Sequence, residues 1–250
     1  MCLVAIAWRA SPLYPLVVAG NRDEFHDRPT AAAGWWENAG HVLGGRDLVA
    51  GGSWLAVSRG GRFAVVVNDP RRPPGAGHTR SRGALVREFV TGETPSGRFL
   101  DAVAVTEGHY AGFSLVVGTR VQLRGFLTAG SGSPHRWTLP VGISVLTNAP
   151  RERPPPKAGL LEAGLRAALG ATVLDRETVF GLLGRREPVG GSPGDEHPAA
   201  RAPFVLGDRY GTRASTLLLM DAEGRCVFEE RRFDAGGAPA GSSREEFLLR

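Results

Sequence analysis

Cys2 is the residue with the clearest capacity for chemistry, because it becomes the first residue of the chain once Met1 is removed. Its small side chain permits that removal, which would leave a free α-amine beside a thiol. An amino-terminal amine can act as the base for its own nucleophile. The ordinary pKa values, about 7.7–8.0 for the α-amine and about 8.5 for the thiol, need little adjustment for both groups to react at neutral pH. The alternative is a cysteine that simply begins a buried strand.

A polar cluster follows the second of two apolar runs. The cluster consists of Asn21, Arg22, Asp23 and Glu24. The runs Cys2 to Trp8 and Leu16 to Ala19, with turn residues between them, predict a β-hairpin whose second strand ends beside the start of the first. The cluster is therefore expected next to Cys2, where an arginine could lower the pKa of the thiol and a carboxylate could hold the amine. An ordinary turn after a strand is the alternative.

Two asparagines end apolar, β-rich runs elsewhere in the chain. Asn68 follows Val65 to Val67, and Asn148 follows Val145 to Thr147. A side-chain amide at the end of a strand can donate a hydrogen bond to a developing oxyanion, and one such donor lowers the barrier of a hydrolase by roughly 2.7–4 kcal/mol. Asparagine also commonly ends strands by capping turns, so each residue taken alone fits either interpretation.

A further arginine lies in the segment Tyr210 to Arg213, immediately before an apolar run. Arg213 could hold a substrate carboxylate through two parallel hydrogen bonds. It could equally bridge to the acidic residues of the polar cluster. The sequence leaves both interpretations open.

Hairpins and amphipathic helices alternate in blocks along the chain, which is typical of an α+β fold with antiparallel sheets and helices on the outside. Helices are expected over 81–89, 96–105, 157–169 and 177–183. Strands beyond the first hairpin are expected over 54–57, 62–67, 112–117, 121–127, 142–147, 214–220 and 226–233. We expect one domain over residues 1–250, with a long surface loop at 185–203 and a mobile tail at 235–250.

Charge and cysteine content argue against several classes of function. The formal net charge is +5, but Lys157 is the only lysine and the arginines are scattered, so we expect no nucleic-acid binding. Cys2 and Cys226 are too few for a disulfide framework and have no metal-site spacing. No apolar segment approaches the length of a membrane span, and no signal peptide precedes the first apolar run. We therefore expect a cytoplasmic protein without stable membrane insertion.

Taken together, these motifs resemble the NRDE family, also called the transport and Golgi organisation family. The matching segments run in order along nearly the whole chain. They are Met1-Cys2, Tyr14-Pro15-Leu16, Ala19-Gly20-Asn21-Arg22-Asp23-Glu24-Phe25, Arg28-Pro29-Thr30, Gly51-Gly52-Ser53-Trp54-Leu55, Asn68, Ser81-Arg82-Gly83, Gly112-Phe113, Thr147-Asn148-Ala149 and Tyr210-Gly211-Thr212-Arg213-Ala214-Ser215-Thr216. More distantly, the layout is similar to amino-terminal-nucleophile cysteine hydrolases such as choloylglycine hydrolases and penicillin V acylases.

The resemblance implies a four-layer αββα sandwich of two antiparallel sheets. It also implies a set of site residues, namely Cys2, Asn21, Arg22, Asp23, Glu24, Asn68, Asn148 and Arg213. Cys2 would be both nucleophile and base, supported by the polar cluster, with either Asp23 or Glu24 in the carboxylate role. The two strand-ending asparagines would donate to the oxyanion, and Arg213 would lie in the wall of the site.

The function implied is hydrolysis of a small non-peptide amide, such as an N-acyl compound, through a thioester on Cys2 and without a required cofactor. The alternative is a non-catalytic carrier of haem or lipid, a role associated with the resembled family. Haem would then be held non-covalently, with Cys2 or His26 as a weak axial ligand. If Met1 is retained, the amine is displaced, and a structural protein with an inactive hydrolase fold is favoured.

Overall fold

The computed structural model describes residues 3–75, 77–128, 134–149, 153–190 and 201–250. The chain divides into two compact units. Unit 1 contains Met1–Arg28 and Pro140–Phe247, and unit 2 contains Pro29–Leu139 and Leu248–Arg250. The single domain expected from the sequence therefore comprises two units, each with its own sheet, helices and hydrophobic core.

Unit 1 is built on a six-stranded sheet in the order β10-β1-β2-β11-β12-β13. Its strands are β1 (Leu3–Trp8), β2 (Leu16–Phe25), β10 (Gly142–Thr147), β11 (Tyr210–Met220), β12 (Arg225–Phe233) and β13 (Pro239–Leu248). β1 and β2 form the expected antiparallel hairpin, with Trp8 opposite Leu16 and Leu3 opposite Asn21. β2 also pairs with β11, so it lies in the interior of the sheet with a neighbour on each side.

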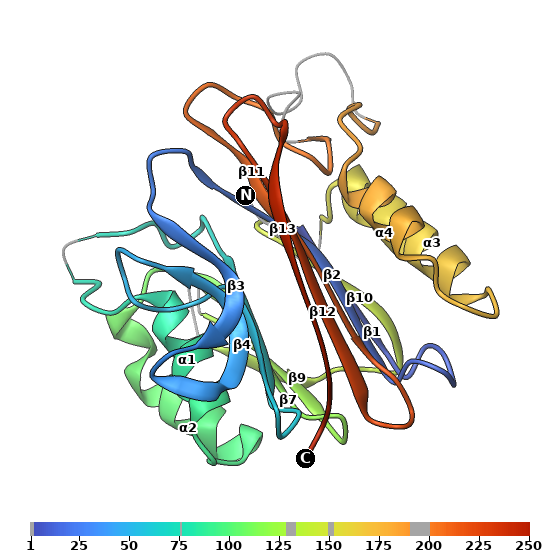
Figure 1. The fold of residues 1–250 in the computed structure, drawn as a ribbon. Coiled ribbons are helices and arrows are strands. Elements are labelled where there is room, and N and C mark those ends of the chain that lie inside the picture. Colours follow the sequence, from blue (N-terminus) through green and yellow to red (C-terminus); the bar gives the residue numbers. More distant parts are fainter. Residues whose placement is uncertain (1–2, 76, 129–133, 150–152, 191–200) are drawn as a thin grey trace. The chain divides into compact units, whose positions relative to one another are not determined.

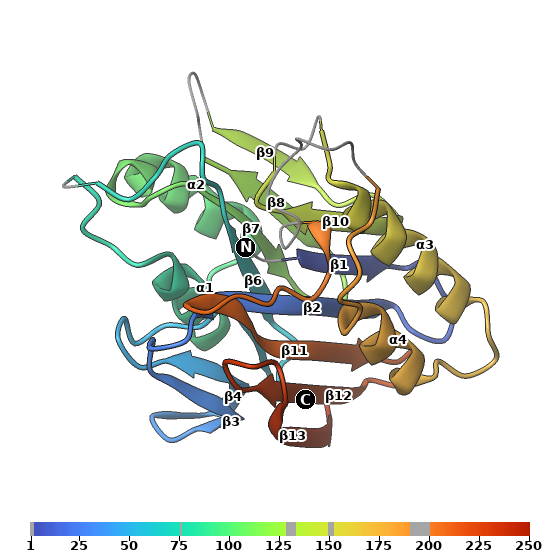
Figure 2. The same cartoon turned by 90° about the horizontal axis from the view of Figure 1, so that it is seen from above.

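Two helices, α3 (Pro156–Leu169) and α4 (Arg176–Leu183), lie side by side against one face of this sheet (Figures 1 and 2). We call this the helix face of unit 1. Its buried cluster contains Leu3, Ala5, Ala7, Val17, Ala19, Leu161, Leu165, Val179, Leu183, Leu217 and Leu219. Side chains alternate between the two faces of a strand, so the odd-numbered residues of β1 and β2 point to the helices.

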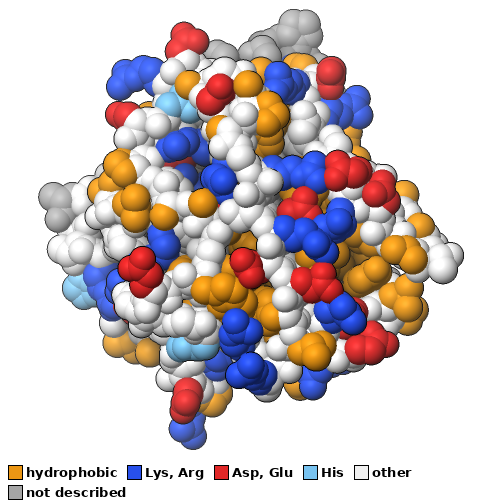
Figure 3. All heavy atoms as spheres, viewed as in Figure 1, with side chains coloured by type: hydrophobic (Ala, Val, Ile, Leu, Met, Phe, Trp, Pro, Cys, Tyr) orange, Lys and Arg blue, Asp and Glu red, His pale blue; other side chains and the backbone are white. Residues whose placement is uncertain are grey.

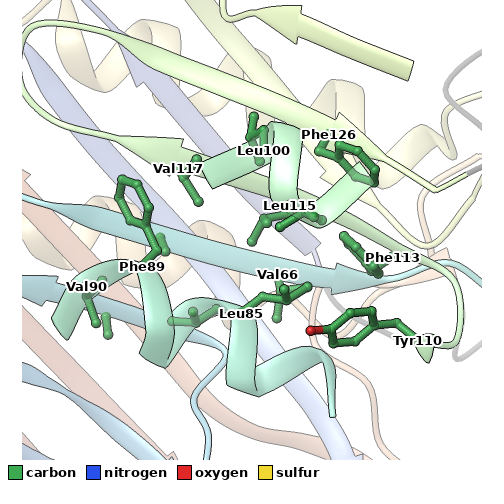
Figure 4. Close-up of a cluster of buried hydrophobic side chains, with 14 of the residues drawn as sticks. Val66, Leu85, Phe89, Val90, Leu100, Tyr110, Phe113, Leu115, Val117 and Phe126 are labelled. Carbon is green, nitrogen blue, oxygen red and sulfur yellow. The ribbon is translucent and has the colours of Figure 1, made fainter. Parts of the chain in front are cut away.

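Unit 2 is built on a seven-stranded antiparallel sheet in the order β3-β4-β5-β6-β7-β8-β9. Its strands are β3 (Thr30–Trp36), β4 (Ala39–Asp47), β5 (Leu55–Ser58), β6 (Phe63–Asn68), β7 (Phe113–Gly118), β8 (Leu123–Leu127) and β9 (His135–Thr138). The helices are α1 (Arg82–Thr91), α2 (Ser96–Thr106) and the short 3-10 helix η1 (Glu107–His109). Figure 4 shows part of the core between helices and sheet, where Leu85 and Phe89 of α1 and Leu100 of α2 belong to the same buried cluster as Leu115 and Phe126.

The expected α+β class with two antiparallel sheets is confirmed. All four expected helices are present. Ser81 caps α1, and its hydroxyl accepts a hydrogen bond from the Gly83 amide (3.2 Å). The strands β3, β4, β9 and β13 were not expected. β9 and β13 lack a clear alternation of buried and exposed apolar residues, which is the signal that predicts a strand from sequence.

Two further expectations are corrected. The mobile tail at 235–250 is wrong over residues 239–248, which form β13 beside β12 at the edge of the sheet. Polar side chains on an exposed edge strand limit pairing with the strands of other molecules. They also remove the apolar alternation by which a strand is predicted from sequence. Of the expected surface loop at 185–203, residues 191–200 lie outside the described residues. Its last residues are not on the surface, because Ala202 and Pro203 are buried.

Candidate functional site

The polar cluster Asn21–Glu24 belongs to β2 itself and is not a turn after the strand. Val17 and Ala19 of the same strand pack against the helices. Strand alternation therefore directs the side chains of Asn21 and Asp23 to the helix face of unit 1. It directs the side chains of Arg22 and Glu24 to the opposite face of the sheet. The cluster consequently has two sides with different surroundings.

Asn21 joins three segments of unit 1 through its side-chain amide. Its Nδ2 donates to the carbonyl oxygens of Leu183 and Pro203, both over 2.9 Å. Its Oδ1 accepts from the hydroxyl of Ser215, which lies opposite on β11, over 2.7 Å. Leu183 is the last residue of α4, where carbonyls have no partner within the helix. Asn21 thus fastens the end of α4 and the segment before β11 to the sheet.

Asp23 is a buried carboxylate on the same face, with 3% of its surface exposed. Its Oδ1 accepts a hydrogen bond from Thr212 Oγ1 over 2.6 Å, and the Tyr210 hydroxyl donates to its backbone oxygen over 2.9 Å. Burial raises the pKa of Asp23 from 3.8 to about 6, although the Thr212 hydrogen bond and the positive charge of Lys157 act in the opposite direction. This carboxylate can therefore change its charge close to neutral pH.

Glu24 has a different environment from Asp23. It lies near two guanidinium groups, with Oε2 at 3.5 Å from Arg22 Nη2 and 3.8 Å from Arg28 Nε. Arg22 is buried, with 5% of its side chain exposed, whereas Glu24 is half-buried. Glu24 is therefore an ion-pair partner of arginines, and Asp23 is the carboxylate that is desolvated and held by a hydroxyl.

Arg213 occupies an irregular position in β11. The pairing of β2 with β11 shifts register between Thr212 and Ala214, so Arg213 is the extra residue of a β-bulge. Its Nη1 donates to the carbonyl oxygens of Arg28 over 2.6 Å and Phe25 over 3.3 Å. Arg213 thus holds the turn that follows β2, a contact that neither sequence interpretation anticipated.

The start of β1 connects these residues to Cys2, which itself lies outside the described residues. Leu3, the next residue, pairs with Asn21 on one side and with Thr147 on the other. Asn148 follows Thr147 directly at the end of β10 and is half-buried. Asn21 and Asn148 therefore lie at the same end of the sheet of unit 1, which is the end where Cys2 enters β1.

Asn68 belongs to unit 2 and is described there by itself. It ends β6 opposite Phe113, and its side chain is exposed. The next residue, Asp69, is buried and forms hydrogen bonds to the Arg71 guanidinium over 2.8–3.1 Å. Asp69 therefore orders the loop that follows β6, and the Asn68 side chain lies on the surface.

Sequence reasoning did not identify Lys157, Thr212 and Ser215 as candidate site residues of unit 1. Lys157 lies in the first turn of α3, is fully buried, and donates from Nζ to the Ala202 carbonyl oxygen over 3.3 Å. A signal was present in the composition, because this is the only lysine beside 29 arginines. The two hydroxyl residues stand in the motif Tyr210 to Thr216, but their partners lie 189 and 194 residues earlier.

The described residues contain no group of three or more histidine, cysteine, aspartate or glutamate side chains that could hold a metal ion. Cys226 is fully buried on β12, and this burial raises the pKa of its thiol far above the ordinary value. Its thiol is therefore a poor nucleophile. In the described part of the chain, no helix is long and apolar enough to cross a membrane.

Charged side chains of both signs are interspersed on the face seen in Figure 3. The described residues include ion pairs such as Arg225 with Glu246 (2.7 Å) and Arg176 with Glu229 (2.6 Å). A stripe of one sign is the usual mark of nucleic-acid binding. The expectation that nucleic acid is not a partner stays a prediction.

Comparison with known sequences connects the chain to one family. A family model described as "Transport and Golgi organisation 2" matches residues 1–235. The mouse (Mus musculus) Transport and Golgi organization 2 homolog is 30% identical over 259 residues, which cover 92% of each chain. The human (Homo sapiens) Transport and Golgi organization protein 2 homolog is 32% identical over 258 residues, again 92% of each chain.

Two kinds of solved structure are similar in fold. The Caenorhabditis elegans ortholog of N-acylethanolamine-hydrolyzing acid amidase has a TM-score of 0.54 and 12% identity, covering 87% of this chain and 92% of that chain. A mutant of conjugated bile acid hydrolase from Clostridium perfringens also has a TM-score of 0.54, with 10% identity, and covers 100% of this chain and 97% of its own. At these identities the likeness concerns the fold alone.

Proposed function

Because the chain belongs to the Transport and Golgi organisation 2 family and has an amino-terminal-nucleophile-hydrolase fold, we propose that it hydrolyses a non-peptide amide through a thioester on Cys2. One observation carries the proposal. Leu3, one peptide unit after Cys2, pairs with Asn21 and Thr147, so the chain start enters the sheet at the end that holds Asp23 and Asn148. A β-strand advances about 3.3 Å per residue, which keeps residue 2 within reach of these side chains.

The proposed reaction uses the α-amine of Cys2 as base and then as acid. The amine takes the thiol proton, and the sulfur attacks the carbonyl carbon of the amide. When the intermediate collapses, the amine returns the proton to the leaving nitrogen, the C–N bond breaks and a thioester remains. Water, activated by the same amine, then attacks the thioester, the thiol regains its proton and the acid leaves.

Within this scheme Asp23 is the carboxylate that orients the α-amine. The environment of Asp23 supports this choice over Glu24, because Glu24 is already near Arg22 and Arg28. Asn148 supplies a donor to the oxyanion, where a preformed amide needs no reorganisation as charge develops. Asn68, which belongs to unit 2, stays a sequence prediction as a second donor. Arg22, on the opposite face of β2, supplies positive charge that favours the thiolate.

An N-acyl compound is the proposed class of substrate. The names of the structurally similar enzymes describe hydrolysis of an N-acylethanolamine and of a conjugated bile acid. Both are small molecules with an acyl part. A panel of N-acyl ethanolamines and N-acyl amino acids of graded chain length is therefore the appropriate first screen.

The test combines intact-mass measurement, covalent labelling with an acyl probe and assays of amide turnover. Intact-mass measurement first establishes that Met1 is absent from the purified protein. A thiol-directed acyl probe should label Cys2, and Cys2→Ala should lower turnover by about a thousandfold or more. Cys226→Ala is the matched control and should change neither readout, because the Cys226 thiol is buried. Unlabelled Cys2, with equal turnover in Cys2→Ala and wild type, would refute the proposal. Binding of haem or lipid without turnover would instead favour the carrier.

A further inference from the structure

Residues 47–51 form a tight turn at the end of β4 in unit 2. The Gly51 amide donates to the Asp47 carbonyl oxygen over 2.8 Å. The Asp47 carboxylate accepts hydrogen bonds from the amides of Val49 over 3.0 Å and Ala50 over 3.2 Å. Gly51 has a φ of 66°, a backbone conformation that favours glycine. These backbone interactions determine the shape of the turn without using its outermost side chains.

The outermost side chains of this turn, Leu48 and Val49, are apolar and exposed. Their exposed fractions are 60% and 62%, and neither belongs to the buried cluster of unit 2. Single exposed apolar side chains are common on protein surfaces. Two of them at the tip of one rigid turn form a small apolar projection, which the packing of the core does not require.

Two arginines converge on the same turn. Arg46 Nη2 and Arg87 Nη1 each donate to the Gly51 carbonyl oxygen over 3.2 Å, so the two positive charges lie close together. The Arg46 guanidinium also packs over the Trp36 ring at 4.5 Å and donates to Asn38 over 3.4 Å. Among the described residues, neither guanidinium forms an ion pair with a carboxylate.

The carboxylates next to these arginines in the sequence have other partners. Glu88 pairs with Arg80 over 2.7 Å, and Asp47 accepts hydrogen bonds from the turn. Two positive charges this close repel each other unless an anion lies beside them. Guanidinium groups bind phosphate and carboxylate oxygens through parallel hydrogen bonds. The turn therefore combines an apolar tip with a base that favours an anion.

We propose that this turn, together with Arg87, is a docking surface for an anionic lipid bilayer. The side chains of Leu48 and Val49 enter the boundary between headgroups and acyl chains, and the two guanidinium groups contact headgroup phosphates. The apolar tip favours a lipid surface over a free phosphate, which offers no apolar region for these side chains. The contact is small, reversible and weakened by salt. It is independent of the proposed hydrolysis.

The experiment measures cosedimentation of the full-length protein with vesicles of phosphatidylcholine, alone or mixed with phosphatidylserine. We expect binding to the mixed vesicles that weakens as salt is raised, and much weaker binding to phosphatidylcholine alone. Arg46→Gln combined with Arg87→Gln should lower the partition coefficient by about tenfold or more. Arg98→Gln combined with Arg153→Gln removes the same charge from exposed positions outside the turn, and it should have a much smaller effect.

Substitutions at the apolar tip provide a second variant that leaves both arginines in place. Leu48→Ser combined with Val49→Ser changes only exposed side chains and should also lower the partition coefficient by about tenfold or more. Val105→Ser, at a position of α2 that is 86% exposed, is the matched control and should leave it unchanged. Circular dichroism checks that each variant is folded.

Several results would overturn the inference. One is wild-type protein that stays in solution with mixed vesicles at low salt, and another is equal binding by wild type and both turn variants. Binding of glycerol phosphate as tight as that of the vesicles would assign the arginines to a free phosphate instead. A dimer in gel filtration that is lost in the Leu48→Ser, Val49→Ser variant would assign the tip to a second copy of the chain.

Discussion

Thr212 donates its only hydroxyl proton to Asp23. The oxygen Oγ1 lies 2.6 Å from Asp23 Oδ1 and 2.8 Å from the Val205 amide nitrogen. Because an amide can only donate, the hydroxyl must accept from Val205, and its single proton is left for the carboxylate. The direction of this hydrogen bond is therefore determined by the backbone. It stabilises the charged form of Asp23, in opposition to the burial that favours the neutral form.

Replacing Thr212 by valine should raise the pKa of Asp23 further. Valine keeps the shape of threonine but leaves both the carboxylate and the Val205 amide without this partner, which should cost about 1–3 kcal/mol of unfolding free energy. Thr212→Ser, which keeps the hydroxyl, is the matched control. Urea unfolding and NMR titration of Asp23 measure the two effects. A stability equal to wild type in the valine variant would show that the hydrogen bond contributes nothing.

Asp23 should make stability depend on pH in a defined direction. Its pKa is 3.8 in the unfolded chain and about 6 in the folded protein. Between these values the folded state keeps a proton that the unfolded state loses, so the Asp23 contribution falls as pH rises from about 4 to 6. The fall should total about 3 kcal/mol and end above pH 6. Denaturation of wild type and Asp23→Asn at several pH values isolates this contribution, and parallel pH profiles would contradict it.

The proposed activity should change with pH in the opposite sense. Asp23 must be ionised to hold the α-amine, so kcat/KM should rise as pH increases through about 6. The same titration therefore lowers stability while it enables the reaction. A pH–rate profile that is flat between pH 5 and pH 7, in a protein that turns over an amide, would exclude Asp23 from this role.

Removal of the Asn21 amide should weaken the attachment of α4. In Asn21→Ala, the buried carbonyls of Leu183 and Pro203 lose a donor, which should cost roughly 2–4 kcal/mol of unfolding free energy. Ser215→Ala removes one hydrogen bond to the same side chain and should cost about 1 kcal/mol. Hydrogen exchange should show faster opening of α4 in the first variant. Equal stability of the two variants would contradict the proposal that the Asn21 amide attaches α4 to the sheet.

Arg213 provides a test between a structural and a substrate-binding role. Its hydrogen bonds to the carbonyls of Phe25 and Arg28 are partly solvent-exposed, so Arg213→Ala should cost only about 1 kcal/mol. Hydrogen exchange of the turn over 25–28 should increase. If Arg213 instead binds a substrate carboxylate, KM should rise without a change in that turn. Arg213→Lys keeps the charge but not the two-carbonyl geometry and separates the two outcomes.

The close approach of α1 explains why the motif Gly51 to Leu55 contains a glycine at its second position, Gly52. A Cβ on Gly52 would lie 2.3 Å from the backbone carbon of Gly83 in α1, so the helix start and this turn would have to separate. Gly52→Ala should therefore destabilise unit 2 by about 3 kcal/mol or more. Gly40→Ala, where a Cβ meets nothing within 4 Å, is the control and should be nearly neutral. Thermal unfolding of both variants compares them.

Local patterns predicted much of the secondary structure. The hairpin β1–β2 and the four helices follow from apolar runs, periodicity and caps such as Ser81, which act over a few residues. The prediction was poorest where local signals are weak, as in the polar edge strand β13 and the glycine-rich pair β3 and β4. There, strand formation depends on pairing with a neighbour that the local sequence does not reveal.

The order of residue types was enough to indicate the family, the α+β class and the proximity of the Asn21–Glu24 cluster to the chain start, because a hairpin brings its own ends together. Only the tertiary structure decided what each polar side chain does. Asn21 finds its partners 162, 182 and 194 residues along the chain, and Asp23 finds Thr212 after 189 residues. Burial of Lys157, whose ammonium donates to the Ala202 carbonyl oxygen, likewise depends on the packing of α3 on the sheet. Such contacts, and the charges they stabilise, arise from the packing of distant segments and have no local signature.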